Sequence, residues 1–387
     1  MTAPDFGHVR AAVTELLPEV VELRRRLHRR PELAFRELAT TELVVSSLQA
    51  AGLQPQTRRP GTGLLVEVGD GERLVGFRAD LDALPIQEPE GLDYRSEIPG
   101  VMHACGHDVH TAIGTGLGLV AARLQLGRRI RFVFQPAEEA FPGGGNQMVS
   151  EGAAADLAAI VAFHCDPALE VGRIGMRPGP ITASADRFYV SLEGPGGHTA
   201  RPHRTVDLVF AAGLLVSHLP GLIDRLTDAR LPKAVVFGTV NGGTAENVIP
   251  TRVELSGTCR TLDRGLWEEI PSLLERLVHD IVAPTGAKVV FNYVRGVPPV
   301  INHVDVVAAC REAVSHSLGV SVIAEAESSM GAEDFSAFTE AVPGALMRLG
   351  VKAQGERPVD LHSASFRADE RAIEVGLLAG MASLLAI

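Results

Sequence analysis

The first part of the chain alternates short apolar segments with longer stretches of helical periodicity, and this alternation restricts the possible folds more than any other feature. Apolar runs of strand length occur at 64–68, 74–77, 130–134 and 158–163, and a helix is expected over about 109–126. Strands that alternate with helices favour a largely parallel sheet with helices on both faces. We therefore predict an α/β fold for this part of the chain.

The order of the expected elements changes near Ala183. A strand, a helix, two strands, a helix and a strand follow, which is the order of a split βαβ, ferredoxin-like α+β module. These elements are expected at 186–194, 205–226, 234–240, 252–260, 264–283 and 288–294. The first pattern then returns, with a helix over about 304–318 and a strand over 345–349. We predict one domain of residues 1–183 and 297–387, interrupted by an inserted domain of residues 184–296.

Composition narrows the class of protein. A chain of 387 residues is long for one core, and 46% hydrophobic with 21% charged residues is typical of a folded protein. The net charge of -11 argues against binding to nucleic acid or to anionic membranes. No signal peptide and no apolar run of membrane-spanning length is recognised. Four cysteines without pairing spacing favour a reducing compartment, so we expect a cytoplasmic protein.

The segment MHACGHDVHTA (102–112) places the thiol of Cys105 two residues from the imidazole of His107. Sulfur and imidazole donors suit zinc, manganese, nickel or cobalt better than magnesium or calcium. Cys105 could equally be an ordinary buried thiol, because free cysteine behaves as a small hydrophobe. The pair becomes informative only because other segments supply further donors.

Polar side chains follow three of the expected strands. Asp80 and Asp82 come after the strand at 74–77, Glu138 and Glu139 after the next, and His164 after the third. Ligands in open α/β sheets gather beyond the carboxyl ends of the strands. We therefore expect these side chains to meet at one edge of the sheet.

A site for two metal ions needs several such donors, with the ions about 3.5–4 Å apart. Candidate ligands with suitable chemistry are Cys105, His107, Glu139, His164 and His362. A single histidine such as His164 is more often a hydrogen-bonded structural residue. The coincidence of donors at strand ends favours the metal interpretation.

The adjacent carboxylates of Glu138 and Glu139 repel each other, so a buried pair needs a cation. If Glu139 binds a metal ion, Glu138 can take a proton from water and deliver it to a leaving amine. A solvated acidic turn is the alternative.

In the inserted domain, His198 could be a surface residue or an oxyanion donor. Arg260 at a strand end could be solvated or could bind a carboxylate.

Taken together, the motifs resemble a known family. They are, in order, RRRLHRRPELAFRE, RADLDALP, HACGHD, QPAEE, GGHTARPH, NGGTAENVIP, MGAEDFS and LHSASF. The chain resembles the amidohydrolase branch of metallopeptidase family 20, which includes enzymes similar to aminoacylase, hippurate hydrolase, N-acetyldiaminopimelate deacetylase and auxin-conjugate hydrolase. The likeness extends over nearly the whole chain. Ala364 and Arg367 depart from the family pattern, which commonly has proline and an acidic residue there.

The resemblance implies a zinc-peptidase-like catalytic domain, an inserted lid that commonly dimerises, and two divalent metal ions. By resemblance, Glu138 is the general base and acid and Asp82 supports the site. His198 would stabilise the oxyanion, reaching across a homodimer or higher homo-oligomer. Asn247 and Arg260 would hold the carboxylate of the substrate. The expected reaction is hydrolysis of an N-acyl amino acid to a carboxylic acid and a free amino acid.

Three alternatives stay open at this point. A metal-free cysteine hydrolase would use Cys105 with His107 or His110 as its base. A dipeptidase or carboxypeptidase-like activity is found in the same family. A metal-binding or ligand-binding module without catalysis would have the same fold, because a fold does not guarantee activity.

Overall fold

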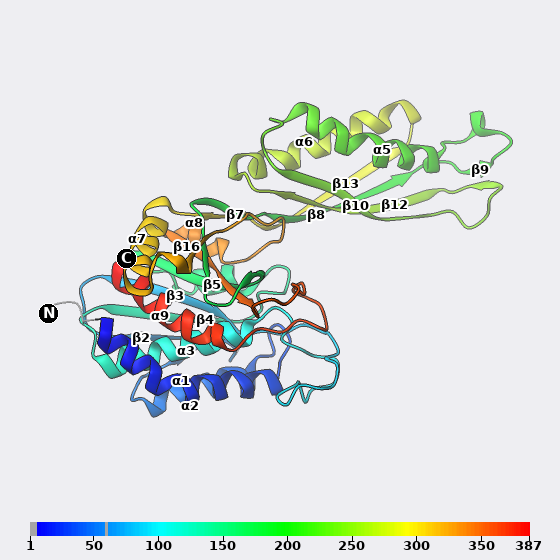
Figure 1. Cartoon of the computed structure of the whole chain (residues 1–387). Coiled ribbons are helices and arrows are strands. Elements are labelled where there is room, and N and C mark those ends of the chain that lie inside the picture. Colours follow the sequence, from blue (N-terminus) through cyan, green and yellow to red (C-terminus); the bar gives the residue numbers. More distant parts are fainter. Residues whose placement is uncertain (1–5, 59–60) are drawn as a thin grey trace. The chain divides into compact units, whose positions relative to one another are not determined.

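The computed structural model describes residues 6–58 and 61–387 and divides into two compact units (Figure 1). The first unit comprises Met1–Ile181, Ile301–Glu327 and Asp334–Ile387. The second comprises Thr182–Val300 together with Ser328–Glu333. The short returning segment Ser328–Glu333 has no counterpart in the domain bounds expected from the sequence. It joins the second unit through backbone bonds, since the amide of Ala183 donates to the carbonyls of Ser329 and Gly331.

The first unit contains an eight-stranded mixed sheet in the order β1-β2-β4-β3-β5-β16-β6-β15. Its strands are β1 (Gln56–Thr57), β2 (Leu64–Val68), β3 (Leu74–Asp80), β4 (Arg129–Gln135), β5 (Ala159–Glu170), β6 (Ile174–Met176), β15 (Ile323–Glu325) and β16 (Gly344–Lys352). The central strands β4, β3, β5 and β16 run parallel, whereas β1, β2 and β6 pair antiparallel with their neighbours β2, β4 and β16. The largely parallel sheet expected from the sequence is therefore the centre of a mixed sheet.

Helices α1 (Phe6–Arg29), α3 (His107–Leu124) and α9 (Arg371–Ala386) pack on one another beside this sheet. Glycines allow α3 to approach its neighbours closely. A Cβ at Gly114 would lie 3.2 Å from the Cβ of Ala79, and one at Gly116 would lie 2.7 Å from Leu377. A Cβ at Gly116 would force Leu377 to move, and one at Gly114 would press on Ala79, so the two glycines allow the close packing of α3. This packing places His107, the first residue of α3, inside the unit.

Shorter helices complete the first unit. They are α2 (Leu38–Ala50), α4 (Gly144–Ser150), α7 (Val304–Leu318) and α8 (Ser336–Ala341). Helix α7 packs on α9, and α4 packs on α8. One continuous apolar core includes side chains from α1, α3, α9 and the central strands. These observations confirm the expected α/β class for the first unit.

The second unit is a four-stranded antiparallel sheet in the order β10-β12-β8-β13, with two helices on one face (Figure 1). Its elements are β8 (Ala185–Glu193), α5 (Leu208–Leu226), β10 (Lys233–Gly242), β12 (Arg252–Thr261), α6 (Arg264–Val282) and β13 (Lys288–Val297). The carboxylates of Asp207 and Asp263 accept the amides of Phe210 and Leu266, which caps the two helices. The order of elements and strands is that of a ferredoxin-like module.

Helix α5 is long and apolar enough to cross a membrane by length and composition, and it is the only such helix among residues 6–58 and 61–387. Its apolar residues at helical spacing face the four-stranded sheet. They are Leu208, Ala211, Ala212, Leu215, Leu219 and Ile223. This burial pattern is typical of a core helix in a folded unit.

Candidate metal centre

The first unit brings together all five candidate metal ligands. Their donor atoms form two groups, each within 4.8 Å, and the Sγ atom of Cys105 belongs to both. The first group adds His107 and His164, and the second adds Glu139 and His362. Nε2 of His164 lies 3.6 Å from Sγ of Cys105, and Nε2 of His362 lies 3.1 Å from Oε1 of Glu139. Donors from five separate positions along the chain therefore converge.

Local backbone geometry produces this convergence. Gly106 has φ 86, and a Cβ there would lie 2.7 Å from Sγ of Cys165. Only glycine therefore fits between Cys105 and His107. His362 also has a positive φ of 61, and its amide donates to the carbonyl of Ala104. That bond ties the last ligand to the segment that carries the first.

The expected positions of two residues beyond their strands were wrong. His164 does not follow β5 but lies within it, because pairing with β16 continues past His164 opposite Arg348. Asp80 likewise is the last residue of β3 rather than a residue beyond it. Sequence periodicity alone underestimates such strands, because their polar ends break the apolar pattern that defines them.

Two histidines are oriented so that Nε2 can bind a metal ion. Nδ1 of His107 lies 2.9 Å from the carbonyl oxygen of Asp82, and Nδ1 of His164 lies 2.9 Å from that of Cys165. A hydrogen bond at Nδ1 fixes the tautomer and leaves Nε2 as the donor atom. Nε2 of His107 is buried and has no hydrogen-bond partner among residues 6–58 and 61–387. Buried polar atoms rarely lack a partner, so a metal ion fits this position.

Electrostatics also suit a cation. Burial raises the pKa of the Cys105 thiol well above its usual range, so a thiolate there needs a positive charge nearby. Burial is the largest single influence on Glu139 and raises its pKa, but the hydrogen bond from His362 and the charges of His107 and His362 together lower the pKa of this carboxyl. The five donors would hold transition-metal ions, for which sulfur and imidazole are preferred ligands.

A further group of possible ligands, Asp80, His107 and His110, lies in the same region. His110, however, uses both ring nitrogens within the protein. Nδ1 lies 2.7 Å from Oδ1 of Asp80, and Nε2 accepts the amide of Cys165 at 2.8 Å. Arg78 donates to the other oxygen of Asp80 at 2.6 Å. Asp80 and His110 therefore support the site and do not offer a ligand atom.

Glu138 lies beside the candidate ligands. Its Oε2 atom is 3.9 Å from Nε2 of His107. The carboxylate of Asp82 accepts the amides of Glu138 and Glu139 at 3.0 and 2.9 Å. Nδ1 of His107 is 3.3 Å from Oδ1 of Asp82. Asp82 thus connects His107 with the loop after β4.

The three remaining candidates belong to the second unit. His198 in β9 (Gly197–His198) is exposed, and its Nδ1 accepts the amide of Ala200 at 3.0 Å. Asn247 lies beside it, since its carbonyl accepts the amide of Thr199. Arg260 is half-buried in β12 and donates to the carbonyl of Met330 at 2.9 Å. Their roles toward a substrate stay predictions.

Sequence reasoning missed several residues that hold the site. Arg78, Glu37 and Asp334 are buried and bond the segments around it. Arg367, one of the two departures from the family pattern, pairs with Glu88 at 3.2 Å. The only sequence signal was a charged residue in an apolar strand, FRAD, which indicates a buried pair.

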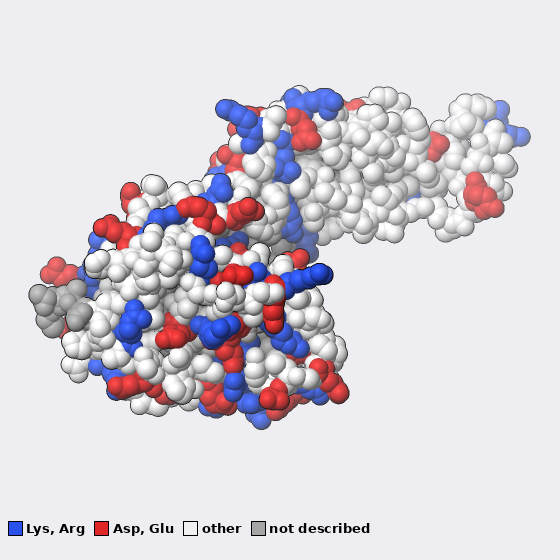
Figure 2. All heavy atoms as spheres, viewed as in Figure 1, with Lys and Arg blue, Asp and Glu red and all other residues white. Residues whose placement is uncertain are grey.

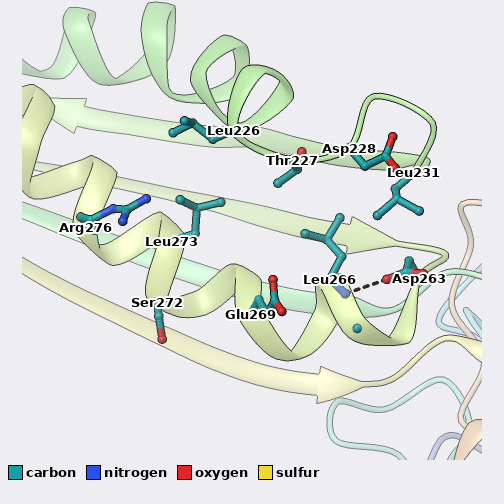
Figure 3. Close-up of a pocket in the computed structure, with 11 residues that line it drawn as sticks. Leu226, Thr227, Asp228, Leu231, Asp263, Leu266, Glu269, Ser272, Leu273 and Arg276 are labelled. Carbon is teal, nitrogen blue, oxygen red and sulfur yellow. Dashed lines mark hydrogen bonds between the residues drawn. The ribbon is translucent and has the colours of Figure 1, made fainter.

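A separate pocket of about 600 Å³ lies in the second unit between the end of α5 and helix α6 (Figure 3). Two of its acidic residues have local partners. Asp228 pairs with Arg230, and Asp263 caps α6. Figure 3 shows apolar side chains between them, and no set of converging catalytic groups is present among the labelled residues.

Comparison with known proteins agrees with this centre. The profile of peptidase family M20/M25/M40 matches residues 76–384. The chain is 36% identical to an N-acetylcysteine deacetylase of Bacillus subtilis, over 92% of the chain and 93% of the relative. It is 38% identical to an N-acyl-L-amino acid amidohydrolase of Geobacillus stearothermophilus, over 76% and 81%.

A solved structure from Bacillus subtilis, a dinuclear metal-binding peptidase of the M20 family, superimposes with a TM-score of 0.84. The two chains are 32% identical, and the alignment covers 96% of this chain and 98% of the other. A larger Rhodococcus jostii protein that carries the name of a glutamate–cysteine ligase is 43% identical over 93% of this chain, which spans 45% of its length. The family match over most of the sequence shows that the chain is a hydrolase and belongs to peptidase family M20/M25/M40.

Proposed function

We propose that the protein hydrolyses the amide bond of N-acyl amino acids and releases a carboxylic acid and a free amino acid. The observation that carries this proposal is the convergence of five donors around Cys105, with Glu138 beside His107. The names of the deacetylase and amidohydrolase relatives support the same substrate class. The ligand set fits two divalent ions chosen from zinc, manganese, nickel and cobalt.

When bound, the two ions would polarise the acyl carbonyl and make water more acidic. Glu138 takes a proton from the attacking water and later delivers it to the leaving nitrogen. Asp82 accepts the amides before and after the Cα atom of Glu138 and so sets the position of the base. We assign oxyanion stabilisation to His198, and binding of the substrate carboxylate to Asn247 and Arg260.

The test is Glu138→Gln, which removes the base and keeps the shape of the side chain. We expect kcat to fall by about 10²–10⁴-fold, the usual contribution of a positioned acid–base group. Metal content measured by mass spectrometry should stay near that of the unchanged protein. Glu151→Gln is the matched control, because Glu151 is exposed after α4. Near-normal turnover of the Glu138→Gln enzyme would rule out the proposed mechanism.

A metal-free cysteine hydrolase is the rival mechanism. The raised pKa of Cys105 works against it, because the thiolate is the nucleophile. Exhaustive chelation separates the two mechanisms, since a thiol enzyme would keep its activity.

Two relatives are named thermostable carboxypeptidases of Saccharolobus solfataricus, at 32% identity. Acyl amino acids and dipeptides should therefore be compared as substrates, and faster cleavage of dipeptides would favour the carboxypeptidase-like activity.

We also propose a homodimer formed through the second unit. The outer face of α5 and the edge strand β10 expose apolar side chains, namely Val209, Phe210, Val216, Val236 and Val240. Figure 2 shows few charged side chains on the visible face over these elements. An unpaired strand edge beside an apolar helix suits pairing with a second copy. Light scattering that gives a fully active monomer would exclude a role for His198 across subunits.

We place the protein in the cytoplasm. All four cysteines are unpaired and buried, which fits a reducing compartment. Cell fractionation tests this location.

A further inference from the structure

The loop after β4 is held through three consecutive backbone amides. The amide of Ala137 donates to Oε1 of Glu37 at 2.8 Å. The next two amides, of Glu138 and Glu139, donate to the two carboxylate oxygens of Asp82. The carboxylates of Glu37 and Asp82, from distant segments, therefore fix the backbone that carries the proposed base.

Glu37 is fully buried directly before α2, yet its side chain does not cap that helix. Oε1 instead accepts two amides, that of Ala137 and that of Phe35 at 2.9 Å. Both donors have left-handed backbone, with φ 56 at Ala137 and φ 61 at Phe35. Residues with a Cβ avoid this region unless their surroundings hold them there. One carboxylate oxygen thus holds two strained peptides.

The second oxygen of Glu37 makes this arrangement costly. Oε2 is buried and has no hydrogen-bond partner within the described part of the chain. Buried polar atoms without partners are rare, and burying a carboxyl group in this way reduces stability. An apolar side chain would fill the same space at lower cost. The gain that offsets this cost includes the two hydrogen bonds that Oε1 accepts from Phe35 and Ala137.

We propose that Glu37 is a positioning residue, which holds Ala137 in its left-handed conformation and thereby places Glu138 for proton transfer. This inference rests on the proposed function, because Glu37 acts through Glu138. Loss of the bond would let Ala137 relax and would shift the following peptide. A displacement of about 1 Å in a catalytic group can cost about 10²-fold in rate. Glycine adopts a positive φ without strain, so Ala137→Gly should reduce the need for the bond.

The experiment compares steady-state kinetics of metal-loaded variants with an N-acetyl amino acid as substrate. Glu37→Ala should lower kcat by about 10²-fold with KM little changed. Glu37→Gln should retain most of the activity, because its amide oxygen can accept both bonds. Adding Ala137→Gly to Glu37→Ala should restore about 10-fold of the lost kcat. An unchanged kcat in Glu37→Ala, or a loss that Ala137→Gly leaves unrepaired, would overturn the proposal.

Glu32→Ala is the matched control. Glu32 also accepts two backbone amides near α2, those of Ala39 and Thr40, but none from the loop after β4. Glu32→Ala should lower stability and leave kcat unchanged. If it lowers kcat as much as Glu37→Ala does, the loss of activity comes from disturbing α2 and not from the bond to Ala137. If the unchanged enzyme cleaves no acyl amino acid, the proposed function fails. A crystal structure of the Glu37→Ala variant then still decides, because a left-handed Ala137 and an unmoved Glu138 would refute the positioning role.

Discussion

Both units have an apolar core, but the first buries many more charged side chains than the second, where Asp186 and Glu333 are buried. The buried charged residues of the first unit include Arg24, Arg78 and Asp82. The second is built on an apolar core that includes Phe188 and Leu215. Buried charges cost energy unless each is paired, whereas apolar burial stabilises without specific partners. The stability of the first unit should therefore depend on ion pairs, and that of the second on packing and helix caps.

Arg78→Ala gives the strongest test of this difference. Arg78 is 1% exposed and donates to Asp80, Gln135 and Asp334. Removing one partner of a buried ion pair leaves an uncompensated charge, and the expected loss of stability is about 3–5 kcal/mol. Urea unfolding of the metal-free protein measures it. The matched control is Arg230→Ala in the second unit, where the guanidinium that pairs with Asp228 is exposed and the midpoint should not move.

A small loss from Arg78→Ala would contradict the comparison. It would mean that Asp80 and Asp334 find other partners when the guanidinium is absent. Asp80 also bonds His110, so Asp80→Asn in the same background would show whether this bond takes over.

The stability of the first unit should also depend on pH through the carboxyl group of Glu37. Burial, with a smaller contribution from the charge of Asp82, raises the pKa of Glu37 from 4.5 to about 7. The folded state therefore keeps a proton that the unfolded state releases between pH 4.5 and 7. The stability from this group is fully present below pH 4.5 and is lost as the pH rises through 7. By linkage the loss is on the order of 3 kcal/mol.

Glu37→Gln isolates this effect, because the amide does not titrate. Urea unfolding from pH 5 to 8 measures the free energy of unfolding of both proteins. As the pH rises, the unchanged protein should become less stable relative to Glu37→Gln. Parallel pH profiles would show that Glu37 is not buried as a neutral acid. Glu37 would then not be one of the buried ionisable groups that distinguish the first unit from the second.

Sequence reasoning recovered the elements better than the contacts between them. The strand at 64–68 has the same bounds in the structure, because its apolar run ends at turn residues on both sides. The bonds of Glu37 to Ala137 and of Arg78 to Asp334 join residues far apart in the chain. Periodicity reports which face of an element is apolar and carries no information about such pairs. The candidate ligands could be proposed from residue type because sulfur and imidazole suit transition metals, whereas the partners of Glu37 and Arg78 could not.

The smallest expected effect concerns the second unit. Asp207 caps α5 by accepting the amide of Phe210 at 3.0 Å, and this helix packs its apolar face on the four-stranded sheet. Asp207→Ala should lower stability by about 1 kcal/mol, the usual value of an N-cap. Asp207→Asn is the control, since asparagine caps equally well and should be nearly neutral. If the second unit depends on packing and caps alone, calorimetry should show this small loss to be independent of bound metal. A loss that grows when the metal ions are removed would show that the two units do not stabilise themselves separately.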